Sequence, residues 1–347
     1  MVYHLPYYPL TSFSLIQEPS TWHIPAGWST IVINTWTNLS SDYYSKTCPD
    51  FDQTLVQVVT DKQIAAPTTA AGTLRLFFHD CMIDGCDASI LVASTPHKTS
   101  ERDADINRSL PGDAFDLITR IKTALELKCP NVVSCSDILV GATRSLVKMV
   151  GGPRINVKYG RKDSLISDMD RVEGKLARPN MTMDHIISIF DAAGLTVQEM
   201  VALVGSHTIG FSHCKEFASR IFNSNAEHSA DFCPEGMNAK YAAELRKLCA
   251  NYTKDAEMSA FNDVFTPGKF DNMYYKNLQN GYGLLESDQA IAFDNRTRPF
   301  VDRYAANETA FFDAFAKAME KFSEQRVKTE LNGDVRRRCD QYNDYKG

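Results

Sequence analysis

Nine cysteines place the strongest constraint on how this 347-residue chain folds, because they are spread over almost its whole length. They stand at positions 48, 81, 86, 129, 135, 214, 233, 249 and 339. No Cys-x-x-Cys pair occurs, so zinc ribbons and thioredoxin-like redox motifs have little support. Dispersed cysteines favour disulfides in a secreted protein, and the alternative is a set of buried reduced thiols in a cytosolic one.

Six Asn-x-Ser/Thr sequons also favour secretion, although each such match is weak by itself. They begin at Asn38, Asn107, Asn180, Asn251, Asn295 and Asn307. Residues 1–41 show no clear signal peptide, because they lack a basic region followed by a long apolar stretch. The compartment is therefore inferred from the cysteines and sequons.

Composition excludes some classes of partner. A hydrophobic content of 44% and a charged content of 23% are typical of a soluble globular protein. The net charge of −6 argues against a nucleic-acid binder, which usually carries a basic face. The longest apolar runs are too short to cross a bilayer. We expect neither a nucleic acid nor a membrane as partner.

From residue 50 onward, apolar residues recur at helical spacing and strand signals are few and short. Capping residues, glycines and prolines bound the expected helices. These helices are 51–66, 69–79, 115–128, 134–150, 182–193, 196–203, 215–222, 239–249 and 299–322, with a Cys/Asp/Gly loop at 80–89. We predict one mainly α-helical domain over residues 42–340. Residues 1–41 are interpreted as a poorly ordered or wrongly predicted extension, and residues 341–347 as a short tail.

Two histidines stand in contexts that suggest chemistry. Arg75 and His79 are four residues apart in an apolar segment, so on a helix they share one face, and a buried arginine needs partners. His207 follows an apolar helical run, where a lone histidine is more often a core residue. A zinc site of His207, His213 and Cys214 is an alternative, but the usual helical ligand spacings are absent.

The two histidines are best explained together. A haem iron needs one axial histidine and, for peroxide chemistry, an acid/base group on its other side. Four motifs stand in order: RLFFHDCMIDGCDAS (75–89), VSCSDIL (133–139), VGSHTIGFSHC (204–214), and FDNMYYKNL followed by LLESDQA (270–290). From Tyr43 to Cys339 the chain resembles a class III plant haem peroxidase. The resemblance implies an all-α haem peroxidase fold, with haem between a distal and a proximal helical half.

The resemblance also implies a role for each candidate residue. His79 matches the distal acid/base, Arg75 its electrostatic partner, and Asn107 the acceptor of the His79 Nδ1 proton. His207 matches the axial ligand of the haem iron, and Asp288 the carboxylate that takes its other proton. Ala177 occupies the place at the haem edge where the family usually has a proline, whose carbonyl contacts aromatic donors.

The implied cofactors are one haem b and two calcium ions. Hard oxygen ligands in a tight turn suit calcium, and the alternative is a solvated acidic loop. The distal calcium site matches Asp80, Ile83, Gly85, Asp87, Ser89 and, through water, Glu101. The proximal calcium site matches Thr208, Asp263, Thr266, Lys269 and Asp271. The implied disulfides are Cys48–Cys129, Cys81–Cys86, Cys135–Cys339 and Cys214–Cys249, which leaves Cys233 as a free, intermolecular or buried thiol.

The resemblance implies a haem peroxidase that reduces hydrogen peroxide and oxidises phenolic donors by one-electron steps. We expect a monomer secreted to the cell wall or the vacuole. The alternative is a secreted calcium- and disulfide-stabilised scaffold that has lost catalysis and acts as a binding protein. The joint presence of Arg75, His79, Asn107, His207 and Asp288 favours the enzyme.

Overall fold

The computed structural model describes residues 39–222 and 236–343. The sequon at Asn38 and the unassigned Cys233 lie outside these residues. The described chain is mainly helical and contains two short strands, which confirms the predicted fold class.

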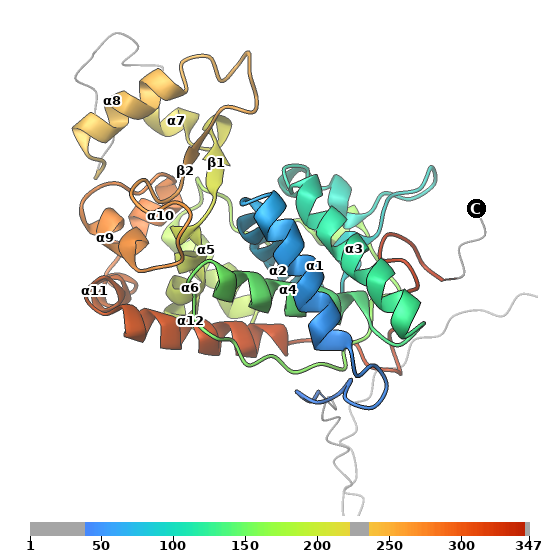
Figure 1. Ribbon diagram of the computed structural model, residues 1–347. Helices are drawn as coiled ribbons and strands as arrows, with labels where there is room; N and C mark the ends of the chain where they lie inside the picture. The colour runs from blue at the N-terminus through green and yellow to red at the C-terminus, as the bar shows by residue number, and fades with distance from the viewer. Residues whose placement is uncertain (1–38, 223–235, 344–347) are drawn as a thin grey trace, which may run out of the picture. The chain divides into compact units, whose positions relative to one another are not determined.

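Most of the described chain consists of α-helices joined by loops and short 3-10 turns (Figure 1). The α-helices are α1 (Phe51–Ala65), α2 (Thr69–Asp84), α3 (Gly112–Lys128), α4 (Cys135–Met149), α5 (Met183–Ala192), α6 (Val197–Val204), α7 (Ala218–Ile221), α8 (Ala239–Leu248), α9 (Met273–Gln279), α10 (Glu286–Ala290), α11 (Arg298–Ala306) and α12 (Glu308–Ser323). The 3-10 turns are η1 (Ser89–Leu91), η2 (Glu101–Asp103), η3 (Asp105–Asn107), η4 (Met169–Arg171), η5 (Gly205–Thr208) and η6 (Cys214–Glu216).

Helices α1 to α4 pack on one another and form one helical group (Figure 1). Helix α2 packs against both α3 and α4, and most of its residues are buried. Helix α4 begins where the sequence indicates, because the Ser134 side chain accepts a hydrogen bond from the Asp137 backbone N–H. This group fixes the helix that carries Arg75 and His79.

A second group consists of α6, α9, α11 and α12. Thr196 and Glu199 form a reciprocal capping box at the start of α6. The turn η5, which carries His207, continues directly from α6 and packs against α9. The short, well-capped helix therefore sets where His207 lies.

Helix α12, a member of the second group, also contacts the first. Its Phe315 ring lies 4.8 Å from that of Phe270, before α9, as measured between ring centroids. At its other end Phe322 contacts Phe77 and Phe78 of α2, at centroid distances of 5.7 and 5.5 Å. Aromatic contacts along one helix thus hold the His79 and His207 groups in one hydrophobic core.

A smaller hydrophobic cluster lies beside η5. Strands β1 (Phe211–His213) and β2 (Ser259–Phe261) pair antiparallel, with Ser212 opposite Ala260. The disulfide Cys214–Cys249 joins the end of β1 to the end of α8. This cluster fixes the chain that leaves His207.

Four disulfides form in the described residues: Cys48–Cys129, Cys81–Cys86, Cys135–Cys339 and Cys214–Cys249. They are the four pairs that the family resemblance implies. Three of them close loops of 35, 81 and 204 residues, so they restrict the unfolded chain strongly.

Three predicted helices differ from those in the structure. The helix expected to end at His79 continues to Asp84, so Asp80 and Cys81 lie in its last turns rather than in a loop. It ends at Gly85, whose φ of 107° is unfavourable for other residues. A Cβ atom there would also collide with the backbone carbonyl of Arg326.

The single helix expected over 299–322 is two helices, α11 and α12. Asn307 interrupts them with an extended backbone, and its side chain caps α12 by accepting from the Ala310 N–H. The segment 215–222 is helical only in the short turns η6 and α7. Helices α9 and α10 were not expected, because they are too short to show a clear period.

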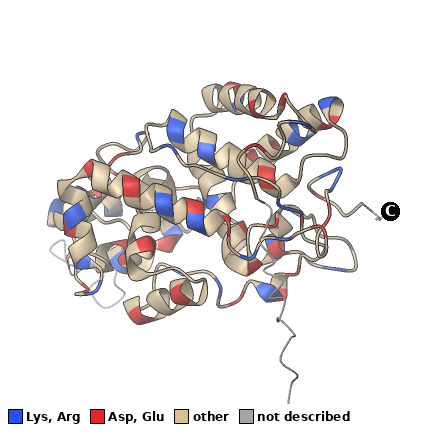
Figure 2. Cartoon of the chain, turned by 90° about the horizontal axis from the view of Figure 1, so that it is seen from below, with Lys and Arg blue, Asp and Glu red and all other residues tan. Residues whose placement is uncertain are grey.

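Charges of both signs occur along the same helices in the view of Figure 2.

Within the described chain no single helix is long and apolar enough to span a membrane. The pair Met183–Ala192 and Val197–Thr208 meets that criterion only when both are taken together, with a bend of 104° between them.

Candidate functional site

His79 lies on α2 and is held through its Nδ1 atom. The Asn107 side chain donates from Nδ2 to the Glu101 carbonyl at 2.7 Å, so its Oδ1 faces His79. His79 Nδ1 lies 2.7 Å from that oxygen and therefore carries the proton that it donates. This tautomer leaves Nε2 as a lone pair, which is what a general base requires.

The surroundings of His79 keep it neutral. Burial and the nearby positive charge of Arg75 lower the pKa of His79 to about 3, and the hydrogen bond with Asn107 opposes them. The side chain is 7% exposed. His79 is therefore a neutral base across the ordinary pH range.

Arg75 is held by neutral acceptors. Its Nη1 donates to the Ser109 carbonyl at 2.9 Å, and its Nη2 donates to the Ser109 hydroxyl at 2.9 Å. A longer bond of 3.4 Å joins Nη2 to the Ile106 carbonyl. Burial lowers the pKa of Arg75, and the charge of Glu216 offsets only part of this effect. Ser109, which the sequence analysis did not name, thus supplies the partners that a buried arginine needs.

His207 is held by Asp288 of α10. Its Nδ1 lies 3.0 and 3.1 Å from the two carboxylate oxygens, and Asp288 is buried. Burial lowers the pKa of His207. The charge of Asp288 and its hydrogen bond together raise that pKa by more, so the net shift is upward. With Nδ1 engaged, only Nε2 is available to a metal.

The charge of Arg75 acts on both histidines. The positive charge of Arg75 lowers the pKa of His79 and acts in the same direction on His207. The His207 side chain is 37% exposed although Asp288 beside it is buried, so it borders solvent-accessible space, here called the histidine recess. An accessible histidine whose Nδ1 is bonded to a carboxylate fits a haem ligand.

The residues matched to the distal calcium site lie together at the end of α2. Asp80 accepts from the Ala88 N–H at 2.9 Å, and the Ser89 hydroxyl donates to Glu101 at 2.9 Å. Burial and the charges of Asp87 and Glu101 raise the pKa of Asp80. Burial also raises the pKa of Asp87, and it raises that of Glu101 to about 8.

One cation already lies beside this acidic group. The Nζ atom of Lys328, a residue that the sequence analysis did not name, lies 3.3 Å from Asp87 Oδ2. Glu101 Oε1 is buried and has no hydrogen-bond partner. The oxygen chemistry of this cluster suits calcium, which would take the place of the Lys328 ammonium at Asp87 and supply the missing partner of Glu101.

The residues matched to the proximal calcium site also lie together. The Thr266 hydroxyl is 3.2 Å from Asp263 Oδ2 and 3.1 Å from Asp271 Oδ1. The Thr208 hydroxyl is 3.4 Å from the Lys269 carbonyl, and Thr208 is the residue after His207. These oxygens suit calcium. Within the described ranges, no group of three or more His, Cys, Asp or Glu side chains is placed to hold a metal, so backbone and hydroxyl oxygens would have to complete either site.

The segment around Ala177 is tied to the His207 side of the recess. Ala177 is half-buried and packs against the main core. The Pro179 carbonyl accepts from the Ser287 N–H at 3.0 Å, one residue before Asp288. Nearby, Arg178 forms an exposed ion pair of 3.2 Å with Asp105.

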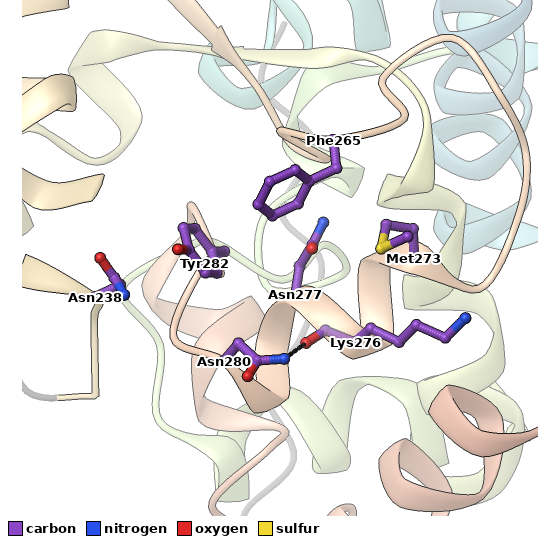
Figure 3. Close-up of a pocket in the computed structure, with 7 residues that line it drawn as sticks. All are labelled: Asn238, Phe265, Met273, Lys276, Asn277, Asn280 and Tyr282. Atoms are coloured by element: carbon purple, nitrogen blue, oxygen red, sulfur yellow. Dashed lines mark hydrogen bonds between the residues drawn. The ribbon is translucent and has the colours of Figure 1, made fainter. Parts of the chain in front are cut away.

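A surface cavity of about 290 Å³ lies elsewhere, next to the proximal calcium residues. Figure 3 shows Phe265 and Tyr282 beside Asn277, whose amide also bonds Asp263 at 2.8 Å. The cavity is lined by Asn238, Phe265, Met273, Lys276, Asn277, Asn280 and Tyr282. None of them belongs to the predicted catalytic set.

Comparison with known proteins decides the family. The family model described as "Peroxidase" matches residues 55–307. The chain belongs to the peroxidase family. It is 83% identical over 310 residues to Peroxidase 6 of Arabidopsis thaliana, covering 89% of this chain and 94% of the relative. It is 57% identical to Peroxidase 65 of the same plant, covering 88% and 89%, and 57% identical to Peroxidase 41, covering 88% and 91%.

These matches confirm the resemblance to class III plant peroxidases and the prediction of a peroxidase oxidoreductase. The family generally implies haem and calcium, together with hydrogen peroxide and small donor substrates. The four disulfides fit a secretory protein. The assignment of individual residues to these roles remains a prediction.

Proposed function

We propose that this peroxidase reduces hydrogen peroxide and takes electrons singly from small phenolic donors, with Arg75, His79 and Asn107 activating peroxide. The observation that carries this proposal is the pair of bonded histidines. His79 is tied to Asn107, and His207 to Asp288, each through Nδ1 and each within reach of the Arg75 charge.

His207 would hold haem b through Nε2, and Asp288 would strengthen it as a ligand by accepting its other proton. Bound haem would supply the redox chemistry, accepting the two oxidising equivalents of peroxide and releasing them one at a time to donors. The two calcium ions would bind at the distal and proximal oxygen clusters described above. They would hold the end of α2 and the residue after His207 in place.

The protein's own part is proton movement and electrostatics. His79 Nε2 takes the proton from the near oxygen of peroxide and delivers it to the far oxygen, which leaves as water. General acid–base help of this kind is worth roughly 10²–10⁴-fold in rate. Arg75 stabilises the negative charge that develops on the departing oxygen, and it can do so because no carboxylate among the described residues pairs with it.

Asn107 contributes by fixing the proton on His79 Nδ1, so that Nε2 can accept one. The carbonyl of Ala177 would contact aromatic donors at the edge of the recess. Without the fixed dihedral of a proline, the orientation of a bound donor is less restricted.

We propose a monomer secreted to the cell wall or the vacuole. The intact bonding of both histidines argues against the alternative of a scaffold that has lost catalysis.

The test is to load the full chain with haem and calcium, record the Soret band, and add peroxide with guaiacol. The proposal predicts an intact haem spectrum and peroxide-dependent oxidation of guaiacol. A normal haem spectrum without any oxidation would contradict the catalytic claim and favour the scaffold.

A further inference from the structure

The loop that follows η2 holds both residues of the predicted distal pair. Asn107 binds His79, and two residues later Ser109 binds Arg75. His79 and Arg75 are one turn apart on α2, so one short loop clamps two neighbouring positions of one helix. The loop is itself fixed, because the Leu110 N–H donates to the Asn107 carbonyl at 3.0 Å.

Ser109 contacts Arg75 at two points. Its carbonyl accepts from Nη1 and its hydroxyl from Nη2, both at 2.9 Å. Two acceptors on the two terminal nitrogens of a planar guanidinium fix its plane as well as its position. The remaining bond, to the Ile106 carbonyl, is 3.4 Å long and is the weakest of the three.

The three acceptors that bind Arg75 are neutral, so they leave its positive charge available to stabilise an anion. Among the described side chains, Arg75 forms no salt bridge, so its positive charge is not neutralised at close range. A guanidinium has five N–H donors, and three bonds occupy three of them. Two donors therefore remain for a ligand.

We propose that Ser109 is a positioning residue for Arg75, and that its hydroxyl sets how strongly Arg75 stabilises an anion in the recess. This inference rests on the proposed function, because it assumes that Arg75 faces the bound peroxide. Ser109 itself would not touch peroxide and would act only through the orientation of Arg75.

The decisive variant is Ser109→Ala, which removes the hydroxyl and keeps the carbonyl. Nη2 would then retain only its long bond, so the guanidinium could turn. We expect the peroxide reaction to slow roughly tenfold, because one hydrogen bond to a charged group is lost. Ser109→Thr restores a hydroxyl and should recover most of that loss.

A second measurement separates positioning from general damage. Fluoride binding to the resting ferric enzyme is an equilibrium that needs no turnover, and an anion in the recess would be stabilised by Arg75. Ser109→Ala should weaken fluoride binding, with the Soret band and the thermal midpoint unchanged. The proteins should come from a host without N-glycosylation, because Ser109 also completes the sequon at Asn107.

The double variant Arg75→Ala/Ser109→Ala completes the cycle. If Ser109 acts through Arg75, its substitution changes neither the peroxide rate nor fluoride binding once Arg75 is gone. Equal effects of Ser109→Ala with and without Arg75, or no effect with Arg75 present, would overturn the inference. If Arg75→Ala alone changes neither quantity, the proposed role of Arg75 fails instead.

Discussion

Asp288 Oδ1 lies 3.0 Å from Nδ1 of His207, although 81 residues separate them in the chain. The carboxylate is 1% exposed, so its charge is directed at the imidazole rather than screened by water. The contact raises the pKa of His207 against the effect of burial. Asp288 would therefore make His207 a stronger electron donor to a metal at Nε2.

The variant Asp288→Asn keeps the shape of the side chain and removes its charge. We expect the ferric/ferrous reduction potential of the haem-loaded protein to rise, because the weaker ligand stabilises ferric iron less. The peroxide reaction should slow by roughly 10–100-fold, as is usual when a partner of a metal ligand is lost. Spectroelectrochemistry and stopped-flow absorbance measure the two quantities.

Glu286→Gln is the matched control for that variant, because Glu286 lies on the same helix and is exposed. It removes an equal charge without a contact to His207, so the potential should stay at the parent value. An unchanged potential in Asp288→Asn would show that Asp288 does not tune the ligand.

The acid limit of the peroxide reaction should depend on Arg75. Burial and the charge of Arg75 hold the pKa of His79 at about 3, so the base stays neutral until the pH falls to that region. Arg75→Leu removes the charge, so the pKa of His79 should rise and the acid limb should move to higher pH. Rates measured between pH 3 and 7 test this. A lower rate with an unmoved limb would mean that Arg75 does not act on His79.

Much of this arrangement follows from local sequence. The spacing of Arg75 and His79 predicts one helical face, and Ser134 marks the start of α4 as a capping residue should. Such signals act over one or two turns, where sequence distance and spatial distance agree. The interruption at Asn307 was missed because the apolar period continues across it, even though Asn307 is a capping residue type.

The rest of the site depends on tertiary contacts. Ser109 lies 34 residues from Arg75 and became its partner only because loop and helix pack together. Lys328 reaches Asp87 from the far end of the chain. No periodicity or motif pairs such residues. Asp288 could be named as the partner of His207 only through the family resemblance, because relatives with the same motifs share the same tertiary contacts.

Calcium removal should make the stability of the protein depend on pH. Burial raises the pKa of Glu101 from 4.5 in the unfolded chain to about 8 in the folded one. A raised pKa gives stability that is fully present below pH 4.5 and is lost as the pH rises through about 8. The thermal midpoint of chelator-treated protein should therefore fall as the pH rises, and added calcium should reduce the fall.

Glu101→Gln should flatten that dependence, because an amide cannot ionise. Glu173→Gln, at an exposed position, should leave it as it is. Calorimetry with and without chelator distinguishes these outcomes. A pH profile that Glu101→Gln leaves unaltered would remove Glu101 from the explanation.

Glycosylation should be absent from Asn107 in active protein. Both polar atoms of its amide are bonded, and the residue is 3% exposed. A glycan on Nδ2 would break its bond to Glu101 and could not fit in the buried site. The sequons at Asn180, Asn251 and Asn295 are exposed and remain available. Peptide mapping of secreted, peroxide-reactive protein should find Asn107 unmodified, and a glycan there would contradict the geometry.

The central claim is that His79 is the acid/base that activates peroxide. The most direct test is stopped-flow absorbance of haem-loaded His79→Ala mixed with peroxide, beside the parent protein. The account predicts that the second-order rate falls by roughly 10²–10⁴-fold while the Soret band of the resting protein remains. A variant that retains its haem and reacts with peroxide at the parent rate would contradict it.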